Sequence, residues 1–306
     1  MAVNVQLLQY SKNNVSGGRI ATFICDYPRF IHAEIMTHRQ FSRNAGSSRA
    51  VPVEAMVELA NDQMCFPSEF RYNKAGMKPA ELMNKADAAV ARKIWEETAQ
   101  TCISGASKLA SLQLHKQWTN RMLEWFTPIK VLITATEWTN FIWLRNDKDA
   151  QIEIQQVGEQ IASLLKNSQP MTISSTEYHV PFITRERMHD GKIRYSVDGK
   201  VLTLEEAIAI SQSCSAQISF RKSDTTYEKA KRLRSMFLDA ERVHASPFEH
   251  QARPMDLSET GFDLNGDWPL GITHIDRNKC RWSGNFKGFI QCRQLIEGNV
   301  YTEGGQ

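Results

Sequence analysis

The densest group of side chains suited to chemistry is a basic, hydroxyl-rich segment near the N-terminus. Residues 37–49 read THRQFSRNAGSSR and hold three arginines, three serines, a histidine and an asparagine. Short hydroxyl and amide side chains leave backbone N–H groups accessible, and guanidinium groups match the geometry of phosphate oxygens. The segment therefore indicates a site for a phosphate-rich ligand. A solvated basic loop is the alternative on composition alone.

Two further groups could carry chemistry. Arg145 follows the run WTNFIWL at 138–144 and precedes the polar residues 146–149. An arginine against an apolar wall has few partners of its own and could polarise an acceptor atom on a bound ring. An arginine that extends from a helix end into water would give the same pattern. The segment HASPFEH at 244–250 holds two histidines, which could be acid–base groups or ligands, or part of a turn before a strand.

Composition and charge exclude several classes of protein. The chain has 306 residues, of which 42% are apolar and 9% aromatic, so it can bury a core and is not disordered. A net charge of +3 is too balanced for a protein that mainly coats nucleic acid, so no nucleic-acid partner is expected. No run of about 18 apolar residues is present, and no membrane association is expected.

The cysteine and histidine spacings point to a cytoplasmic protein without a metal site. The six cysteines are widely separated, with no CxxC pair, and residues 1–14 do not resemble a signal peptide. This pattern predicts reduced thiols in a cytoplasm. The sequence has no HExxH motif, so no metal is expected, and no GxGxxG motif that would support a Rossmann site.

Hydrophobic periodicity predicts the elements that position these groups. Residues 19–25 (RIATFIC) predict a strand, and Asp26 and Pro28 fit the start of a following helix. Apolar residues at helical spacing predict a long helix, or two in series, over 79–114, and another helix over 149–166.

The middle and the second half of the chain add shorter elements. Residues 130–138 fit a buried strand or a helix start, and the alternation at 191–202 predicts a hairpin with a type I′ turn at Asp198-Gly199. Two capping boxes each predict a helix: Thr203 with Glu206, and Thr225 with Glu228.

These elements predict an α/β (α+β) fold with a central β-sheet flanked by long helices. We expect one main domain over 1–254. The tail from about Met255 is rich in Gly, Asn, Asp and Trp, so 255–306 is expected to be a loop-rich extension that completes this domain.

The three groups together resemble the flavin-dependent thymidylate synthases. The signature of that family is an Arg-His-Arg-x-x-Ser-x-Asn-x-x-Ser-x-Arg string, which residues 37–49 match in most positions. The resemblance continues in five further segments and covers about two thirds of the chain: 120–124, 140–145, 149–156, 215–220 and 246–250. In the typical member the SPFEH-type segment precedes the signature, whereas here it follows about two hundred residues later. The chain therefore resembles a circularly permuted member of the type associated with bacteriophage genomes.

The resemblance implies an enzyme and assigns roles to individual residues. It implies transfer of a one-carbon unit from methylenetetrahydrofolate to C5 of dUMP, with reduced FAD as hydride donor and NADPH as the reductant of the flavin. Arg145 would bond to the pyrimidine and favour ionisation at N3. The other roles are FAD binding by His38, Arg39, Asn140 and Ser246, nucleotide binding by Ser47, Arg49 and Arg121, and a folate-side position for His244. The resemblance further implies that 1–254 is the catalytic domain that binds flavin and nucleotide. It also implies a homotetramer with active sites at subunit interfaces.

The sequence departs from the family signature at several positions. Thr37 replaces its first arginine, and Ala45 replaces a glutamate that contacts flavin and nucleotide. The loss of positive charge suggests a replacement elsewhere, and Arg293 is the candidate for a phosphate contact. Three alternatives to thymidylate synthesis stay open: a dUMP or dCMP 5-hydroxymethylase, a transferase with Cys292 as nucleophile, and a non-catalytic flavin- or nucleotide-binding relative.

Overall fold

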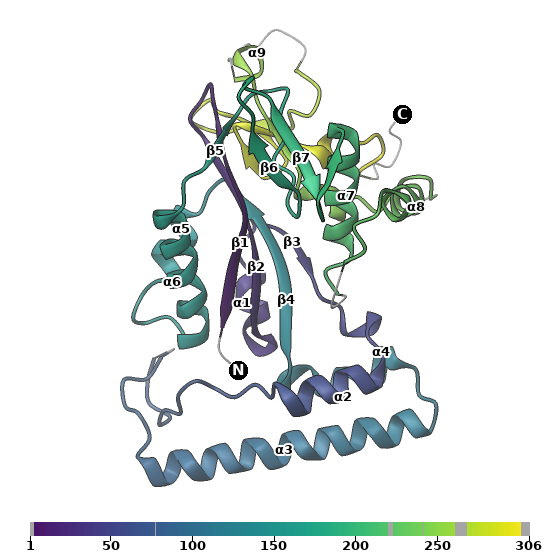
Figure 1. Ribbon diagram of the computed structural model, residues 1–306. Coiled ribbons are helices and arrows are strands. Elements are labelled where there is room, and N and C mark those ends of the chain that lie inside the picture. Colours follow the sequence, from purple (N-terminus) through teal and green to yellow (C-terminus); the bar gives the residue numbers. More distant parts are fainter. Residues whose placement is uncertain (1–2, 77, 220–222, 241, 261–267, 301–306) are drawn as a thin grey trace.

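The computed structural model describes residues 3–76, 78–219, 223–240, 242–260 and 268–300. Its centre is a five-stranded sheet in the order β3-β4-β2-β1-β5, in which only β1 and β5 are parallel (Figure 1). The strands are β1 (Asn4–Asn13), β2 (Arg19–Pro28), β3 (Ser42–Ala45), β4 (Pro128–Ala135) and β5 (Met171–Ile173). The predicted strand at 19–25 is confirmed, and the ambiguous segment 130–138 begins as a strand.

The two faces of the central strands differ in chemistry, because successive side chains of a strand point to opposite sides. Odd-numbered residues of β2 and β4, such as Phe23, Cys25 and Val131, join one buried apolar cluster. Even-numbered residues on the opposite face are mixed: Ile20 and Leu132 are apolar, whereas Thr22 and Thr134 are polar, and all four are buried. The odd-numbered face therefore supplies the main core, and the opposite face adds buried polar groups to a second packed layer.

Strand β2 is longer than the sequence predicts. Asp26 pairs with Lys130 in the ladder, and Pro28 pairs with Pro128 at the strand end, where neither proline must donate to the ladder. A 3-10 turn, η1 (Arg29–Ile31), then precedes the short helix α1 (His32–Met36). The predicted helix start at Asp26 or Pro28 is therefore wrong, because pairing with β4 outweighs the local capping signal.

Helices cover the odd-numbered face and close one end of the sheet. Helices α5 (Thr139–Arg145) and α6 (Ile152–Asn167) lie on one side, and α6 buries Ile154, Val157 and Ile161 against the sheet (Figure 1). Helices α2 (Val53–Asp62) and α3 (Lys85–Ser111) lie across its lower end (Figure 1). The helix predicted over 79–114 is one continuous helix. It begins later than expected because the Asn84 side chain accepts the N–H of Asp87 as its N-cap.

The second half of the chain packs beside the other face. It contains the sheet β6 (Thr184–Arg187), β7 (Ile193–Val197) and β8 (Lys200–Leu202), followed by α7 (Leu204–Ala216) and α8 (Tyr227–Leu238). Asp198 and Gly199 both have positive φ, of 48° and 79°, which confirms the type I′ turn.

One of the two predicted capping boxes is present. Thr203 and Glu206 cap α7 reciprocally, as predicted. The box at Thr225 is wrong, because the Thr225 hydroxyl donates to Asp198 and the neighbouring Thr226 caps α8 instead.

The tail contains short strands between its loops. They are β10 (His274–Ile275), β11 (Arg281–Ser283), β12 (Phe286–Lys287) and β13 (Phe289–Gln291), with the 3-10 turn η5 (Cys292–Leu295) after them. Strand β13 pairs with β9 (Ala252–Pro254), and Phe289 belongs to the same buried apolar cluster as Ile20 of the central sheet. Residues 261–267 and 301–306 of the predicted extension, and Phe220 of the 215–220 segment, lie outside the described residues. The boundary at 254 stays a prediction.

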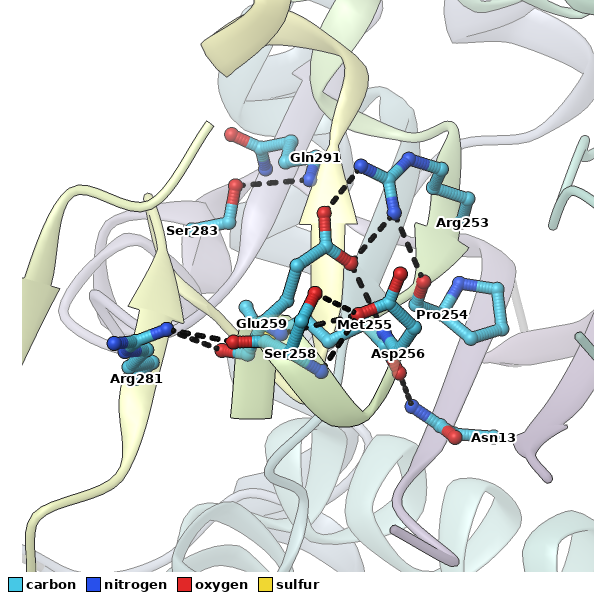
Figure 2. Close-up of polar contacts among 10 residues, drawn as sticks. All are labelled: Asn13, Arg253, Pro254, Met255, Asp256, Ser258, Glu259, Arg281, Ser283 and Gln291. Carbon is cyan, nitrogen blue, oxygen red and sulfur yellow. Dashed lines mark hydrogen bonds and ion pairs between the residues drawn. The ribbon is translucent and has the colours of Figure 1, made fainter. Parts of the chain in front are cut away.

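Hydrogen bonds fix the start of the tail. Arg253 donates to both carboxylate oxygens of Glu259, at 2.8 and 2.6 Å, and Asp256 accepts the N–H groups of Ser258 and Glu259 (Figure 2). Arg281 donates to the carbonyls of Ser258 and Glu259 in the helix α9 (Leu257–Thr260). None of the helices in the described ranges is long and apolar enough to span a membrane.

Candidate active site

The signature segment forms β3 and a tight loop that presses against β4. Gly46 donates its N–H to the carbonyl of Lys130 at 2.8 Å, and an added Cβ at Gly46 would lie 3.3 Å from that oxygen. The loop continues into the 3-10 turn η2 (Ser48–Ala50). A glycine at this position therefore lets the loop lie close to the strand.

Two other segments that resemble the family hold this loop. Asn120, the first residue of the 3-10 helix η3 (Asn120–Phe126), donates to the carbonyls of Ser48 and Val51 at 2.8 and 3.0 Å. On the other side, the backbone N–H of Ser47 donates to the hydroxyl of Ser219 at 2.9 Å. Segments far apart in the sequence thus converge on Ser47 and Ser48.

Glu124 connects the loop to two arginines. Its carboxylate accepts the Ser48 hydroxyl at 2.6 Å and the Nη1 of Arg121 at 3.2 Å, and it lies 3.5 Å from the Nη1 of Arg29. Arg121 was predicted as a nucleotide ligand, whereas Arg29 was missed. The one available signal for Arg29 is its position directly after a buried apolar strand.

A cavity of about 480 Å³ opens between the signature loop, α2 and the ends of β2 and β4. Its polar lining residues include Asp26, Arg29, Ser47 and Lys130. Its apolar lining residues include Val51, Ala55, Met56 and Leu59, from α2 and the turn before it. Such a cavity suits a small ligand with an anionic group and an apolar or planar part.

A second centre joins His38 and Arg145. The Nε of Arg145 donates to the Nε2 of His38 at 3.0 Å. His38 stacks on Phe41 with ring centroids 5.7 Å apart and meets Phe141 edge-on at 4.8 Å. Burial, together with the positive charges of Arg145 and Arg43, lowers the pKa of His38 to about 4. The imidazole is therefore neutral at ordinary pH and acts as an acceptor.

The structure places the other predicted site residues as follows. Arg39, Arg49, Asn140 and Ser246 are exposed, and their side chains make no hydrogen bond or ion pair within the described part of the chain. His244 is exposed and lies edge-on to Phe237, with ring centroids 6.4 Å apart.

Arg293 is not part of the cavity wall. Its guanidinium is ion-paired with Glu249 of the SPFEH segment and donates to the carbonyl of Asn299 at 3.2 Å. Within the described residues the structure thus brings His38 to Arg145, and Arg121 to the Ser47–Ser48 loop through Glu124. It leaves Arg293 and His244 outside both groups.

A buried chain of hydrogen bonds crosses the even-numbered face of the sheet. The hydroxyls of Thr22 and Thr134 lie 2.7 Å apart, Thr22 contacts the Nε2 of His179 at 2.8 Å, and Thr134 contacts the Nδ1 of His250 at 2.8 Å. Both histidines are fully buried. Burial lowers both of their pKa values, that of His250 to about 3. The described residues contain no group of three His, Cys, Asp or Glu placed to hold a metal ion.

The fold and the site are those of an α/β protein in which basic residues of separate segments lie around one cavity. A family model described as thymidylate synthase complementing protein matches residues 8–171. The match covers more than half of the chain, so the chain belongs to the thymidylate synthase complementing protein family and is an enzyme that modifies pyrimidine nucleotides. The segment 244–250 lies outside the matched residues.

Solved structures show a weaker likeness. Two structures of a UMP/dUMP methylase PolB from Streptomyces cacaoi are similar to this chain, one bound with 5-Br UMP and one with 5-Br dUMP. Their sequence identities are 15% and 16%, and their TM-scores are 0.42 and 0.44. Each alignment covers 53% of this chain, and 88% and 89% of the two other chains. No curated protein matches the sequence significantly.

Proposed function

We propose that the protein is a flavin-dependent thymidylate synthase, which transfers a one-carbon unit from methylenetetrahydrofolate to C5 of dUMP. The observation that carries this proposal is the convergence of the 120–124 and 215–219 segments on the signature loop, which lines a cavity together with Arg29 and Lys130. Family membership supports the class of reaction, and the charge and volume of the cavity suit a pyrimidine monophosphate.

Ser47, Arg49 and Arg121 would hold the nucleotide, and Arg145 would contact its pyrimidine base. The Arg145 guanidinium has five N–H groups, and only Nε is used by His38. The remaining N–H groups can donate to an oxygen of the pyrimidine ring and stabilise negative charge that develops on ionisation at N3. Electron density would then increase at C5, the atom that accepts the one-carbon unit.

The residues assigned to FAD fit an anionic cofactor. Arg39 is exposed and has no carboxylate partner among the described residues, so its guanidinium is free to bind a pyrophosphate. Asn140 and Ser246 likewise have unused polar groups, and neutral His38 offers a flat ring supported by Phe41. When bound, FAD would supply the hydride that reduces the transferred carbon, after its own reduction by NADPH. His244 would lie on the folate side.

The position of the SPFEH segment supports a circular permutation. Its last residue, His250, bonds to Thr134, which pairs with Thr22 near the start of β2. Strand β2 in turn leads into the signature. The segment therefore lies beside the strand that leads into the signature, although it follows the signature in the sequence. We infer that the chain is circularly permuted.

We further propose a homotetramer with active sites at subunit interfaces. Trp118, Trp125 and Trp143 are 62%, 62% and 74% exposed, and they flank the 120–124 segment and Arg145. Exposed aromatic side chains of this size next to a site are typical of a surface that a partner subunit covers. Light scattering after size exclusion measures the assembly. The six free thiols suit a reducing cytoplasm in a bacterial or phage-infected cell.

The absorption spectrum of the purified protein tests this function. The protein mixed with FAD and desalted should retain a flavin spectrum, and NADPH should bleach it faster when dUMP is present. A protein that binds flavin but never oxidises NADPH with nucleotide would be a non-catalytic relative, and the proposal would be wrong.

A further inference from the structure

We propose that Arg29 binds the phosphate group of the substrate nucleotide and takes the role that the signature arginine, replaced here by Thr37, has lost. This inference rests on the proposed function, since it names a group that would hold the nucleotide of that reaction. Thr37 cannot take that role itself: its hydroxyl donates to the carbonyl of Glu34 at 2.7 Å, and its side chain carries no charge.

Arg29 is fixed in the cavity wall. It follows Pro28, the last residue of β2, and its backbone N–H donates to the carbonyl of Thr127 at 3.1 Å. Its side chain is only 16% exposed, and one Nη2–H donates to the carbonyl of Gly46 in the signature loop at 3.3 Å. The guanidinium is therefore held beside the loop that carries Ser47.

Most of the donors of this guanidinium are unused. Of the five N–H groups of an arginine, those on Nη1 and Nη2 make one contact each, to Glu124 and Gly46. The Nε atom is buried and has no hydrogen-bond partner. An unpaired donor on a buried charge is costly, so it is expected where a ligand completes the bonding.

The positive charge around Arg29 is only partly compensated. Glu124 is shared between Arg29 and Arg121, and it also accepts the Ser48 hydroxyl. Among the residues that line the cavity, Arg29 and Lys130 are cationic, and Asp26, which pairs with Lys130 in the strand ladder, is a carboxylate. Two cations and one carboxylate thus line the cavity. A phosphate dianion would balance this excess and bind through charge-assisted hydrogen bonds.

Ser47 supplies a second donor on the same cavity. Its hydroxyl makes no hydrogen bond to the described residues, although its backbone N–H is bonded to Ser219. A guanidinium and a free hydroxyl that line the same cavity make a recognisable phosphate-binding pair. Arg293, the arginine predicted for a phosphate contact, is instead engaged by Glu249 and does not line this cavity.

Calorimetric titration of the full chain with dUMP and with deoxyuridine tests the assignment. Arg29→Gln is expected to weaken dUMP binding roughly 10- to 100-fold, the usual loss for a charged hydrogen bond, and to leave deoxyuridine binding unchanged. Arg29→Lys keeps the charge but loses the planar guanidinium that can donate two parallel hydrogen bonds. We therefore expect an intermediate loss of dUMP affinity. Because Arg29→Gln leaves Glu124 without one cation, the lysine variant decides the question if the glutamine variant fails to fold.

Arg253→Gln is the matched control. Arg253 is 20% exposed and is also bonded to one carboxylate, that of Glu259, but it lies outside the cavity wall (Figure 2). Its loss should leave dUMP affinity unchanged. Unchanged discrimination between dUMP and deoxyuridine in folded Arg29→Gln or Arg29→Lys protein would overturn the assignment and leave the proposed function intact. If the unaltered chain bound no pyrimidine monophosphate, the proposed function would fail and this assignment with it.

Discussion

Arg145 donates a hydrogen bond to His38 across 3.0 Å, although 107 residues separate them in the sequence. Because arginine can only donate, the Nε2 of His38 must accept, and its proton must reside on Nδ1. This agrees with the lowered pKa of His38, about 4. The pair holds one guanidinium in a fixed direction while most of its N–H groups stay free. This is the property that a group polarising a substrate ring requires.

Replacement of Arg145 should therefore affect the chemical step more than binding. We expect Arg145→Lys to lower kcat for dUMP by about 100-fold, because a lysine cannot keep the bond to His38 and also reach the ring with a planar fork. Initial rates of product formation at saturating dUMP measure this. The control is Arg194→Lys, since Arg194 is an exposed arginine bonded to Glu186 in the β6–β7 hairpin. A kcat that changes less than about twofold in Arg145→Lys would contradict the role of Arg145.

Gly158 of α6 lets the backbone at Arg145, the end of α5, lie close to α6. An added Cβ at Gly158 would lie 3.0 Å from the carbonyl carbon of Arg145 and 3.0 Å from the backbone nitrogen of Asn146. We expect Gly158→Ala to push the end of α5 outward and to cost about 1–3 kcal/mol of unfolding free energy. It should also lower kcat, because Arg145 moves with the backbone. Urea denaturation and initial rates measure the two effects.

Ser163→Ala is the control for that change, since Ser163 is an exposed residue of the same helix. Its unfolding free energy and kcat should stay close to those of the unaltered protein. If Gly158→Ala behaved like Ser163→Ala, the contact between α5 and α6 would not set the position of Arg145.

The buried histidines predict a loss of stability in mild acid. Their folded-state pKa values lie below the unfolded value near 6.5, that of His250 at about 3, because burial disfavours the charged imidazole. Their contribution to stability is therefore complete above about pH 6.5 and is lost as pH falls below it, for His250 down to about pH 3. As pH falls from 6.5 to 5.5, each histidine should lower the free energy of unfolding by about 1 kcal/mol.

Denaturation at several pH values, with His250→Gln as the variant, tests this dependence. Glutamine does not titrate, so the variant should lose about half of the acid sensitivity that the two histidines cause, whatever its stability at neutral pH. An identical slope of unfolding free energy against pH in both proteins would show that His250 is protonated in the folded state or does not contribute.

Cys292 should be dispensable for turnover. Its side chain is buried, and burial raises its pKa to about 12, so the thiolate that a nucleophile requires is absent near neutral pH. We expect Cys292→Ser to retain most of the activity, with a small loss of stability. Abolished turnover in a folded Cys292→Ser protein, together with a covalent nucleotide adduct on the unaltered one, would instead support the cysteine-based alternative.

The sequence predicts those features that depend on local chemistry. The strand β2, the turn at Asp198-Gly199 and the cap at Thr203 follow from the residues themselves. The errors at Asp26 and Thr225 have a common cause, because each side chain or backbone group is engaged by a distant partner, Lys130 or Asp198. Tertiary contacts outweigh local capping signals at such positions.

The candidate site was only partly visible in the sequence. The signature segment and Arg145 stand out by composition and by resemblance. Arg29 does not, because its importance arises from Glu124 and the Gly46 carbonyl, which lie 95 and 17 residues away in the chain. The residues that line the cavity come from separate segments, so no single segment of the sequence shows a motif for it.

Mass spectrometry of the nucleotide product tests the central claim most directly. The protein would be incubated with FAD, NADPH and methylenetetrahydrofolate, and with dUMP or dCMP in parallel. We predict that dUMP gains one CH2 unit, the mass change of a methyl group that replaces hydrogen at C5, while dCMP is unchanged. A gain of CH2O, or modification of dCMP in place of dUMP, would contradict thymidylate synthesis and identify a 5-hydroxymethylase or a cytosine-specific enzyme.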